Sequence, residues 1–232
     1  MSIIVKDATG ANVTIKTIDD LLDDAGAVSE GSPLPVSVQG GSSHMGRVGG
    51  TTRRAADGFT RPGDATAYSA GDLIANSQTA TEVTPLVFDV ARLPSGSGRI
   101  SGATCVLEAA SGSLAPLPQF DLLLFRPQGN IPYGDGLYPA DNAAWSLTAA
   151  QMAQLVAVIR FSDLGWRNRQ GGNTGSGPLL YQTAPISPRQ FAPFDLAPLG
   201  VTHLRGLVQT TAAWAAPNVG ITFDFTLDVD QD

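Results

Sequence analysis

Residues 221–229, "ITFDFTLDV", alternate between apolar and polar side chains, and no other segment restricts the fold of this chain as strongly. The apolar positions are Ile221, Phe223, Phe225, Leu227 and Val229. In a β-strand, consecutive side chains point to opposite faces, so a period of two gives one buried face and one wet face. The alternation predicts a strand in a sheet that covers a core on one side.

Further strands are expected throughout the part of the chain that follows residue 59. The candidate segments are residues 84–90, 98–109, 119–125, 155–164, 178–183 and 202–213. Helix is indicated at residues 146–155, where Thr148 and Gln151 have the spacing of a capping box. Many strands with few helices, separated by loops rich in Gly, Pro, Asn and Ser, predict an all-β domain built as an antiparallel β-sandwich or jelly roll.

Composition divides the chain into three parts. Residues 1–37 are predicted to form a small unit, with strands at 2–6 and 12–16 followed by a helix. Residues 38–58 are dense in Gly and Ser without an apolar period, which is typical of a flexible linker. Residues 59–232 are predicted to form the β-sandwich domain.

The charge of the chain limits its partners. The formal net charge is −7 and the pI is about 4.7, so nucleic acid and anionic membranes are not expected partners. Charged residues make up 15% of the chain, against about 25% in a typical soluble domain. Either neighbouring subunits cover part of the surface, or the surface is rich in uncharged polar residues. The chain has no apolar run of about 18 residues and no signal-peptide pattern, so we expect it to be made and folded in a cytoplasm.

Residues suited to catalysis are sparse. The sequence has no G-x-S-x-G nucleophile motif and no phosphate-binding loop. His203 could belong to a Ser-His-Asp site or be an ordinary histidine at a strand edge, and we favour the second reading. The single cysteine, Cys105, lies in an apolar run and is expected to be a buried thiol. We therefore predict no enzymatic activity and no cofactor.

Metal ligands are also few. One cysteine and two histidines do not supply a zinc site. Two groups of residues could offer oxygen ligands to calcium: Asp135, Asp141 and Asn142 form one, and Asp224, Asp228 and Asp230 form the other. Neither has the spacing of an EF-hand, and no metal site is predicted.

Four arginines lie in and just after the predicted linker, at positions 47, 53, 54 and 61. Residues 1–30 are acidic, with six acids and two lysines. The arginines could form a basic strap that docks on an acidic neighbour, or they could simply be solvated.

Residues 59–77, "FTRPGDATAYSAGDLIANS", carry a resemblance to a known family. The segments "TPLVFDVARLPSGSGRISGATCVLEA" and "QFDLLLFRPQ" follow them. Together these residues resemble a family of virion proteins of tailed bacteriophages, which share a close variant of the motif F-T-R-P-x-D-x-T-x-Y-x-x-G-D. The similarity extends best over residues 59–126, and residues 1–37 also resemble the start of such proteins.

This resemblance implies a β-sandwich fold without catalysis. It suggests a virion structural protein on the exterior of the capsid, which decorates or cements it. The expected partners are the major capsid protein and further copies of the chain, as a homo-oligomer such as a trimer. The expected assembly contacts are Ile3, Ile4, Ile18, Leu21, Leu22, Arg47, Arg53, Arg54 and Arg61. The alternative is a host-surface or glycan-binding module of a tail or fibre, which would be supported by an exposed aromatic cluster among Tyr133, Tyr138, Trp145 and Trp166.

Overall fold

The computed structural model divides the chain into two compact units, Met1–Gly46 and Arg47–Asp232. The residues that it describes are 3–6, 12–15, 51–110, 114, 116–127, 138–168, 179–185, 192–196 and 199–231. In the first unit, β1 (Ile3–Lys6) pairs antiparallel with β2 (Asn12–Ile15). The two predicted strands of this unit are confirmed, whereas its predicted helix lies outside the described residues.

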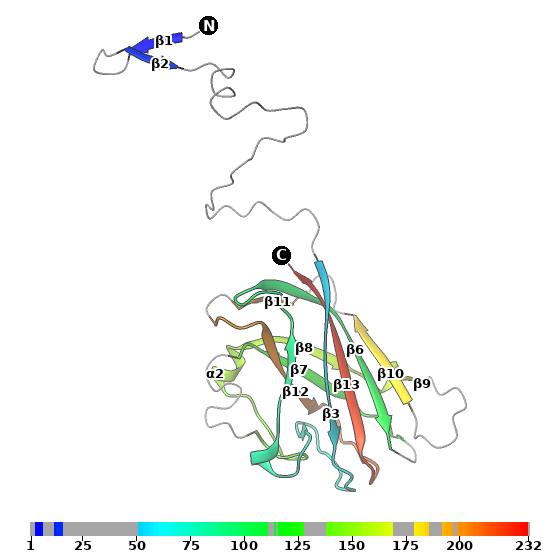
Figure 1. Ribbon diagram of the computed structural model, residues 1–232. Helices are drawn as coiled ribbons and strands as arrows, with labels where there is room; N and C mark the ends of the chain where they lie inside the picture. Colours follow the sequence, from blue (N-terminus) through cyan, green and yellow to red (C-terminus); the bar gives the residue numbers. More distant parts are fainter. Residues whose placement is uncertain are drawn as a thin grey trace. The chain divides into compact units, whose positions relative to one another are not determined.

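The second unit contains two antiparallel sheets (Figure 1). The first sheet has the strand order β3 (Thr51–Arg61), β13 (Ile221–Gln231), β6 (Ser97–Ala109), β10 (Leu179–Pro185) and β9 (Arg167–Asn168). Strand β11 (Ala192–Asp195) also pairs with β6. We refer to this sheet as the large sheet.

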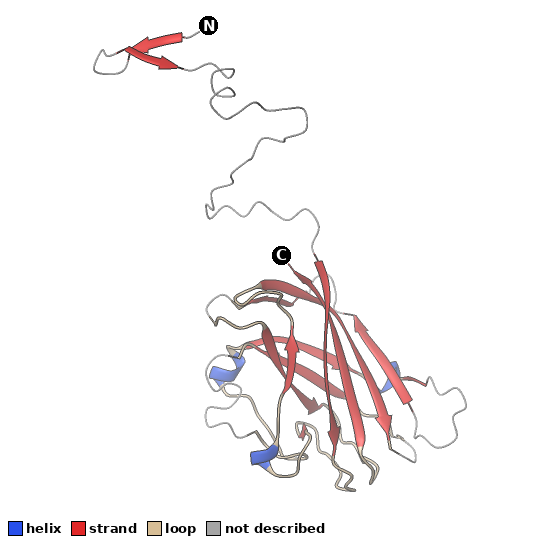
Figure 2. Ribbon diagram, viewed as in Figure 1, coloured by secondary structure: helices blue, strands red, loops and turns tan. Residues whose placement is uncertain are grey.

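The second sheet packs against the large sheet. Its order is β4 (Leu73–Ile74), β12 (His203–Thr210), β7 (Phe120–Phe125) and β8 (Leu155–Phe161), and β5 (Leu86–Asp89) also pairs with β12. Helical segments are short: η1 (Ala80–Glu82), α2 (Ala149–Met152) and η2 (Asp163–Gly165), drawn in blue in Figure 2. The predicted all-β sandwich is confirmed, as is the capping box formed by Thr148 and Gln151 at the start of α2.

Strand β13 is an interior strand of the large sheet, between β3 and β6, and supplies much of the core. The five apolar residues of the alternating pattern are each at most 1% exposed, while the residues between them are half-buried or exposed. Phe223 and Phe225 pack against Phe120 on β7, with ring centroids 5.6 and 6.1 Å from its ring. Aromatic pairs of this kind contribute roughly 0.5–1.5 kcal/mol beyond the burial of their area, so β13 and β7 hold the two sheets together.

Strand β7 is buried on both faces, unlike β13. Phe120, Leu122 and Leu124 belong to the core between the sheets. Leu123 and Phe125 belong to a second cluster on the opposite face, where Trp145 packs against the Phe125 ring. This second cluster explains why "FDLLLF" lacks alternation, because a strand covered on both sides gains from apolar residues at every position.

The large sheet begins before residue 59. Strand β3 spans Thr51–Arg61 and pairs with β13 along its whole length, from Thr51 opposite Gln231 to Arg61 opposite Ile221. The predicted linker of residues 38–58 is therefore wrong for its last part, since residues 51–58 are strand. The apolar signal is weak here because the inward positions of β3 include Arg53, Asp57 and Arg61 as well as Ala55 and Phe59.

The inward charges of β3 join the two sheets at their edge. Arg53 forms an ion pair with Asp89 of β5 and donates to the Ala91 carbonyl at 3.2 Å. The Asp57 carboxylate accepts a hydrogen bond of 2.5 Å from the Val87 backbone N–H. Inward-pointing charges on an edge strand discourage the pairing of that edge with another chain.

Candidate functional site

The motif residues 59–72 lie around a buried arginine that connects several segments. The Arg61 side chain is fully buried at the end of β3. Its Nη2 donates to the Asp64 carbonyl at 2.9 Å, and its Nε donates to the Tyr68 hydroxyl at 2.5 Å. The guanidinium carbon lies 5.2 Å from the Tyr68 ring centroid and 5.9 Å from that of Trp214, so Arg61 also makes cation–π contacts with both rings. We call Arg61, Asp64, Tyr68, Asp141 and Trp214 the arginine cluster.

Asp141 is the buried counter-charge in the arginine cluster. Its Oδ2 lies 3.6 Å from Arg61 Nε, and both of its carboxylate oxygens lie 2.7 Å from the Tyr68 hydroxyl that donates to them. The Ala75 backbone N–H donates to Oδ1 at 2.8 Å. Asp64 adds a second carboxylate, with Oδ1 at 3.3 Å from Arg61 Nη2. Each buried charge is thus paired and hydrogen-bonded, which is the condition for keeping charges in a protein interior.

The surroundings of the arginine cluster shift the pKa values of three of its groups. Burial raises the pKa of Asp141, while the Ala75 N–H, the Tyr68 hydroxyl and Arg61 act in the opposite direction. Burial and the Asp141 charge raise the pKa of Tyr68, so its hydroxyl stays protonated and remains a donor. Burial alone would raise the pKa of Asp64, but hydrogen bonds from Thr66 and Gln78, together with Arg61, lower it.

The neighbouring motif residues have structural roles as well. Phe59 stacks on Phe223 with ring centroids 5.2 Å apart. Gly71 has φ of +96°, a conformation that favours glycine. The Asp72 carboxylate accepts from the Ser69 N–H at 2.5 Å and closes the turn before β4. Residues 59–72 therefore fix the connection between the large sheet and the second sheet, and we call them the clamp.

Arg61 is not the assembly contact that was predicted. Its side chain is fully buried and its hydrogen-bond partners belong to the same chain, so no neighbouring molecule can reach it. This prediction is wrong because it relied on arginines that are close in sequence, and these do not reveal that Arg61 is buried beside Asp141.

The other predicted assembly residues are not brought together among the described residues. Arg53 forms the ion pair with Asp89 of β5 described above. Arg54 points outward on β3, where it pairs with Asp228 at 3.1 Å. Ile3 and Ile4 lie in β1 of the first unit. Ile18, Leu21, Leu22 and Arg47 lie outside the described residues.

The residues considered for chemistry are dispersed. His203 begins β12, opposite Asp89, and burial lowers its pKa, with Arg205 adding to the effect. Cys105 is fully buried, as predicted, and burial raises its pKa well above the ordinary value. Within the described part of the chain, no group of three His, Cys, Asp or Glu side chains is placed to hold a metal ion. The same residues contain no helix long and apolar enough to cross a membrane.

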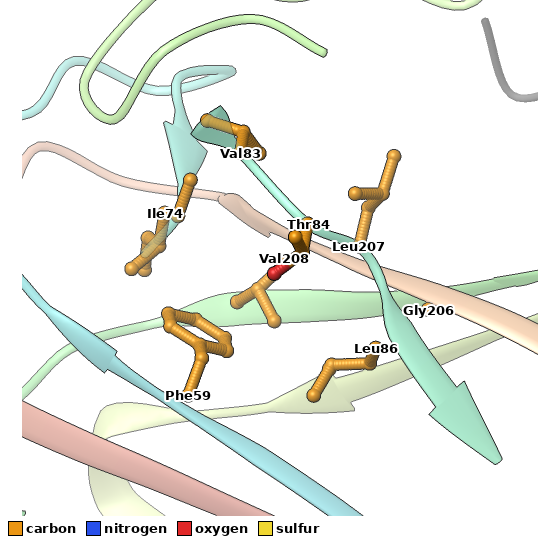
Figure 3. Close-up of a pocket in the computed structure, with 9 residues that line it drawn as sticks. Phe59, Ile74, Val83, Thr84, Leu86, Gly206, Leu207 and Val208 are labelled. Atoms are coloured by element: carbon orange, nitrogen blue, oxygen red, sulfur yellow. The ribbon is translucent and has the colours of Figure 1, made fainter. Parts of the chain in front are cut away.

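A small cavity lies where β4 and β5 separate along the same edge of β12 (Figure 3). Phe59, Ile74, Leu86 and Val208 point toward one another around it. Its volume is about 10 Å³, and a water molecule needs at least about 10–15 Å³ and polar partners. The cavity is a packing void and has no room for a ligand.

A larger hollow of about 400 Å³ lies between β8 and β11. Its described lining consists of Arg126, Leu155, Val156, Pro193, Phe194 and Asp195. It combines apolar walls with one arginine and one carboxylate, and these residues form no nucleophile–base pair.

Three of the four aromatic residues considered for glycan binding are buried. Trp145, Trp166 and Tyr138 are 6%, 9% and 7% exposed. The Trp166 Nε1 donates to the Pro118 carbonyl at 3.0 Å, inside the core. Tyr133 lies outside the described residues. These side chains do not form the exposed aromatic cluster that the glycan-binding alternative requires.

Comparisons with known proteins give little similarity. No family model matches the chain, and no curated protein matches it. One solved chain, described as "Cyanophage Pam1 capsid asymmetric unit", is 14% identical; the match covers 85% of this chain and 99% of that chain, with a TM-score of 0.26. This is a weak structural similarity to a phage capsid chain. A TM-score of 0.26 does not establish a shared fold.

Proposed function

We propose that this protein is a non-enzymatic structural component of a tailed-phage virion, which decorates or cements the exterior of the capsid. The observation that carries the proposal is the sequence of the motif at residues 59–72. Its similarity to phage virion proteins includes Phe59, Arg61, Tyr68, Gly71 and Asp72, which together build the clamp between the sheets. The resemblance therefore concerns residues that determine how this sandwich is built.

The division of the chain supports a separate attachment unit. Residues 47–232 hold the two packed sheets, and Met1–Gly46 is a compact unit of its own. A unit of about 40 residues is close to the lower limit at which a chain sustains a core without help. We propose that this unit completes its apolar burial against a capsid subunit or a neighbouring copy.

Many copies on a lattice would make weak contacts sufficient. Each exposed ion pair contributes roughly 0–1 kcal/mol, but simultaneous engagement of several sites multiplies weak affinities. The proposed partners are the major capsid protein and further copies of this chain. The described residues offer no observation in favour of the glycan-binding alternative.

The composition of purified particles tests the proposal. Virions of the phage that encodes this protein would be purified through a density gradient and analysed by quantitative mass spectrometry and antibody labelling. The proposal predicts many copies per particle, in a fixed ratio to the major capsid protein, with label on intact heads. Its absence from purified particles would contradict a virion role, and label confined to tails would contradict decoration of the capsid.

A further inference from the structure

Two turns lie side by side at one end of the sandwich. The first spans residues 91–96, between β5 and β6, and the second spans residues 199–202, just before β12. The backbone N–H groups of Ala91 and Ser95 donate to carbonyls of the second turn, at 2.8 and 3.0 Å. Residues 92–95 are exposed, and residues 199–201 are exposed or half-buried. We call residues 92–95 and 199–201 the tip.

The first turn is anchored and carries a strained residue. Val90 and Ala91, which lead into it, are at most 1% exposed. The Gly96 carbonyl at its other end accepts a hydrogen bond of 3.1 Å from the Leu196 N–H. Ser95 has φ of +65°, in the left-handed region that residues other than glycine and asparagine seldom adopt. Such strain persists only where the surroundings impose it, and it concentrates at functional sites.

The tip presents apolar side chains to the solvent. Leu93 is 67% exposed, Pro94 is exposed, and Val201 on the second turn is half-buried. Single exposed apolar residues are common on protein surfaces and need no explanation. Leu93 differs from these because it lies two residues before the strained Ser95, in an anchored turn that holds it away from the core.

Arg92 places a positive charge beside Leu93. Its side chain is exposed and forms no ion pair with any residue that the structure describes. By contrast, Arg54 and Arg99 on the large sheet pair with neighbouring aspartates. Arginine is enriched at protein interfaces and binds carboxylates strongly. A leucine next to an unpaired guanidinium is therefore complementary to an apolar pocket with a carboxylate at its rim.

The tip lies at the end of the sandwich where β3 begins. Arg53, near the start of β3, donates to the Ala91 carbonyl at 3.2 Å. Gln231, at the end of β13, donates to the Val90 carbonyl at 2.7 Å. The start of β3 and the C-terminal end of β13 lie side by side (Figure 1). The chain therefore enters the large sheet at the end where the tip lies.

We propose that the tip is a second contact with the capsid, in which Leu93 enters an apolar pocket of a capsid subunit and Arg92 pairs with a carboxylate at the rim. This inference rests on the proposed function. Attachment through the residues before β3 would tether the sandwich by the end that carries the tip. The tip adds to that attachment and does not replace it.

Quantitative binding to particles that lack this protein tests the inference. Full-length wild-type protein and the full-length variants Leu93→Ser and Leu164→Ser would be titrated against such particles, and the bound copies counted. Leu93→Ser is expected to raise the half-saturation concentration at least tenfold. Leu164→Ser is the matched control and is expected to leave it unchanged, because Leu164 is 91% exposed in η2, which follows the far end of the second sheet.

The charge of the tip is tested by Arg92→Glu. This variant is expected to bind at least tenfold more weakly at low salt, and the difference from wild type should shrink as the ionic strength rises, because salt screens exposed charges. Thermal melts of all variants establish that they remain folded.

The outcomes separate this inference from the proposed function. Failure of the wild-type protein to bind would contradict the virion role, and this inference with it. Normal binding of the wild type that Leu93→Ser leaves unchanged would overturn the inference alone. Self-association of the free protein that Leu93→Ser abolishes would also overturn it, because the tip would then bind a second copy instead of the capsid.

Discussion

Arg61 is a charged side chain placed where an apolar one would ordinarily be expected. Its guanidinium is fully buried between two aromatic rings and two carboxylates, and it joins β3 to the segments that contain Tyr68 and Asp141. Removing one partner of such a pair leaves an uncompensated buried charge, which typically costs about 3–5 kcal/mol. The arginine therefore fixes the connection between the sheets, and its replacement is costly.

The coupling within the arginine cluster can be measured. We predict that Arg61→Met lowers the free energy of unfolding by about 3–5 kcal/mol, and that Asp141→Asn also destabilises the protein. The double variant should lose less than the sum of the two, because it no longer buries an unpaired charge. Urea unfolding of the four proteins gives the comparison. Additive losses would show that the two side chains act independently.

The alternating strand allows a matched pair of substitutions at adjacent positions. Phe223→Ala removes a fully buried ring and is expected to cost about 3–5 kcal/mol. Thr222→Ala removes a half-exposed side chain on the solvent side of the large sheet and is expected to cost little. Chemical denaturation measures both. Small and equal losses would contradict the assignment of Phe223 to the core.

His203 provides a prediction for the dependence of stability on pH. Burial, with Arg205 nearby, lowers its pKa in the folded protein below the ordinary value of 6.5. The unfolded chain therefore takes up this proton more readily, and His203 costs stability as the pH falls through about 6.5. We expect His203→Gln to reduce the loss of stability between pH 7 and about pH 5. An unchanged or steeper pH dependence in the variant would refute this assignment of the shift.

Elements with a clear local sequence pattern could be predicted from the sequence, whereas β3 and the arginine cluster could not. Strand β13 alternates, and Gln151 completes a capping box at α2, so both were expected. Strand β3 was missed because its inward positions include Arg53 and Asp57, whose partners on β5 are distant in sequence. The arginine cluster could not be predicted either, since Asp141 lies 73 residues from Tyr68 and only the fold brings them together.

The corrected start of the sandwich has a consequence at the scale of a strand. A fragment of residues 59–232 would lack residues 51–58 of β3 and would expose the edge of β13. We expect a fragment of residues 47–232 to melt cooperatively, near the temperature of the full-length chain. The shorter fragment should melt at a lower temperature or aggregate, because an exposed central strand is a template for pairing with other chains. Calorimetry measures both melting temperatures, and equal values would show that residues 51–58 of β3 contribute nothing to stability.

At the scale of the whole molecule, the two units have separate proposed roles. The sandwich of residues 47–232 is held together by β13, β7 and the arginine cluster. The unit Met1–Gly46 is proposed to attach the protein to the capsid. Folding of the sandwich and attachment can be tested separately, because the first is measured in solution and the second requires particles.

Binding to particles that lack this protein tests the central claim most directly. Full-length protein and the fragment of residues 47–232 would each be mixed with such particles and sedimented, and the bound copies counted. The account predicts that the full-length protein binds in a saturable manner and that the folded fragment stays in the supernatant. Binding of the fragment at the level of the full-length chain would place the attachment surface in the sandwich. Failure of the full-length protein to bind would contradict its role as a capsid component.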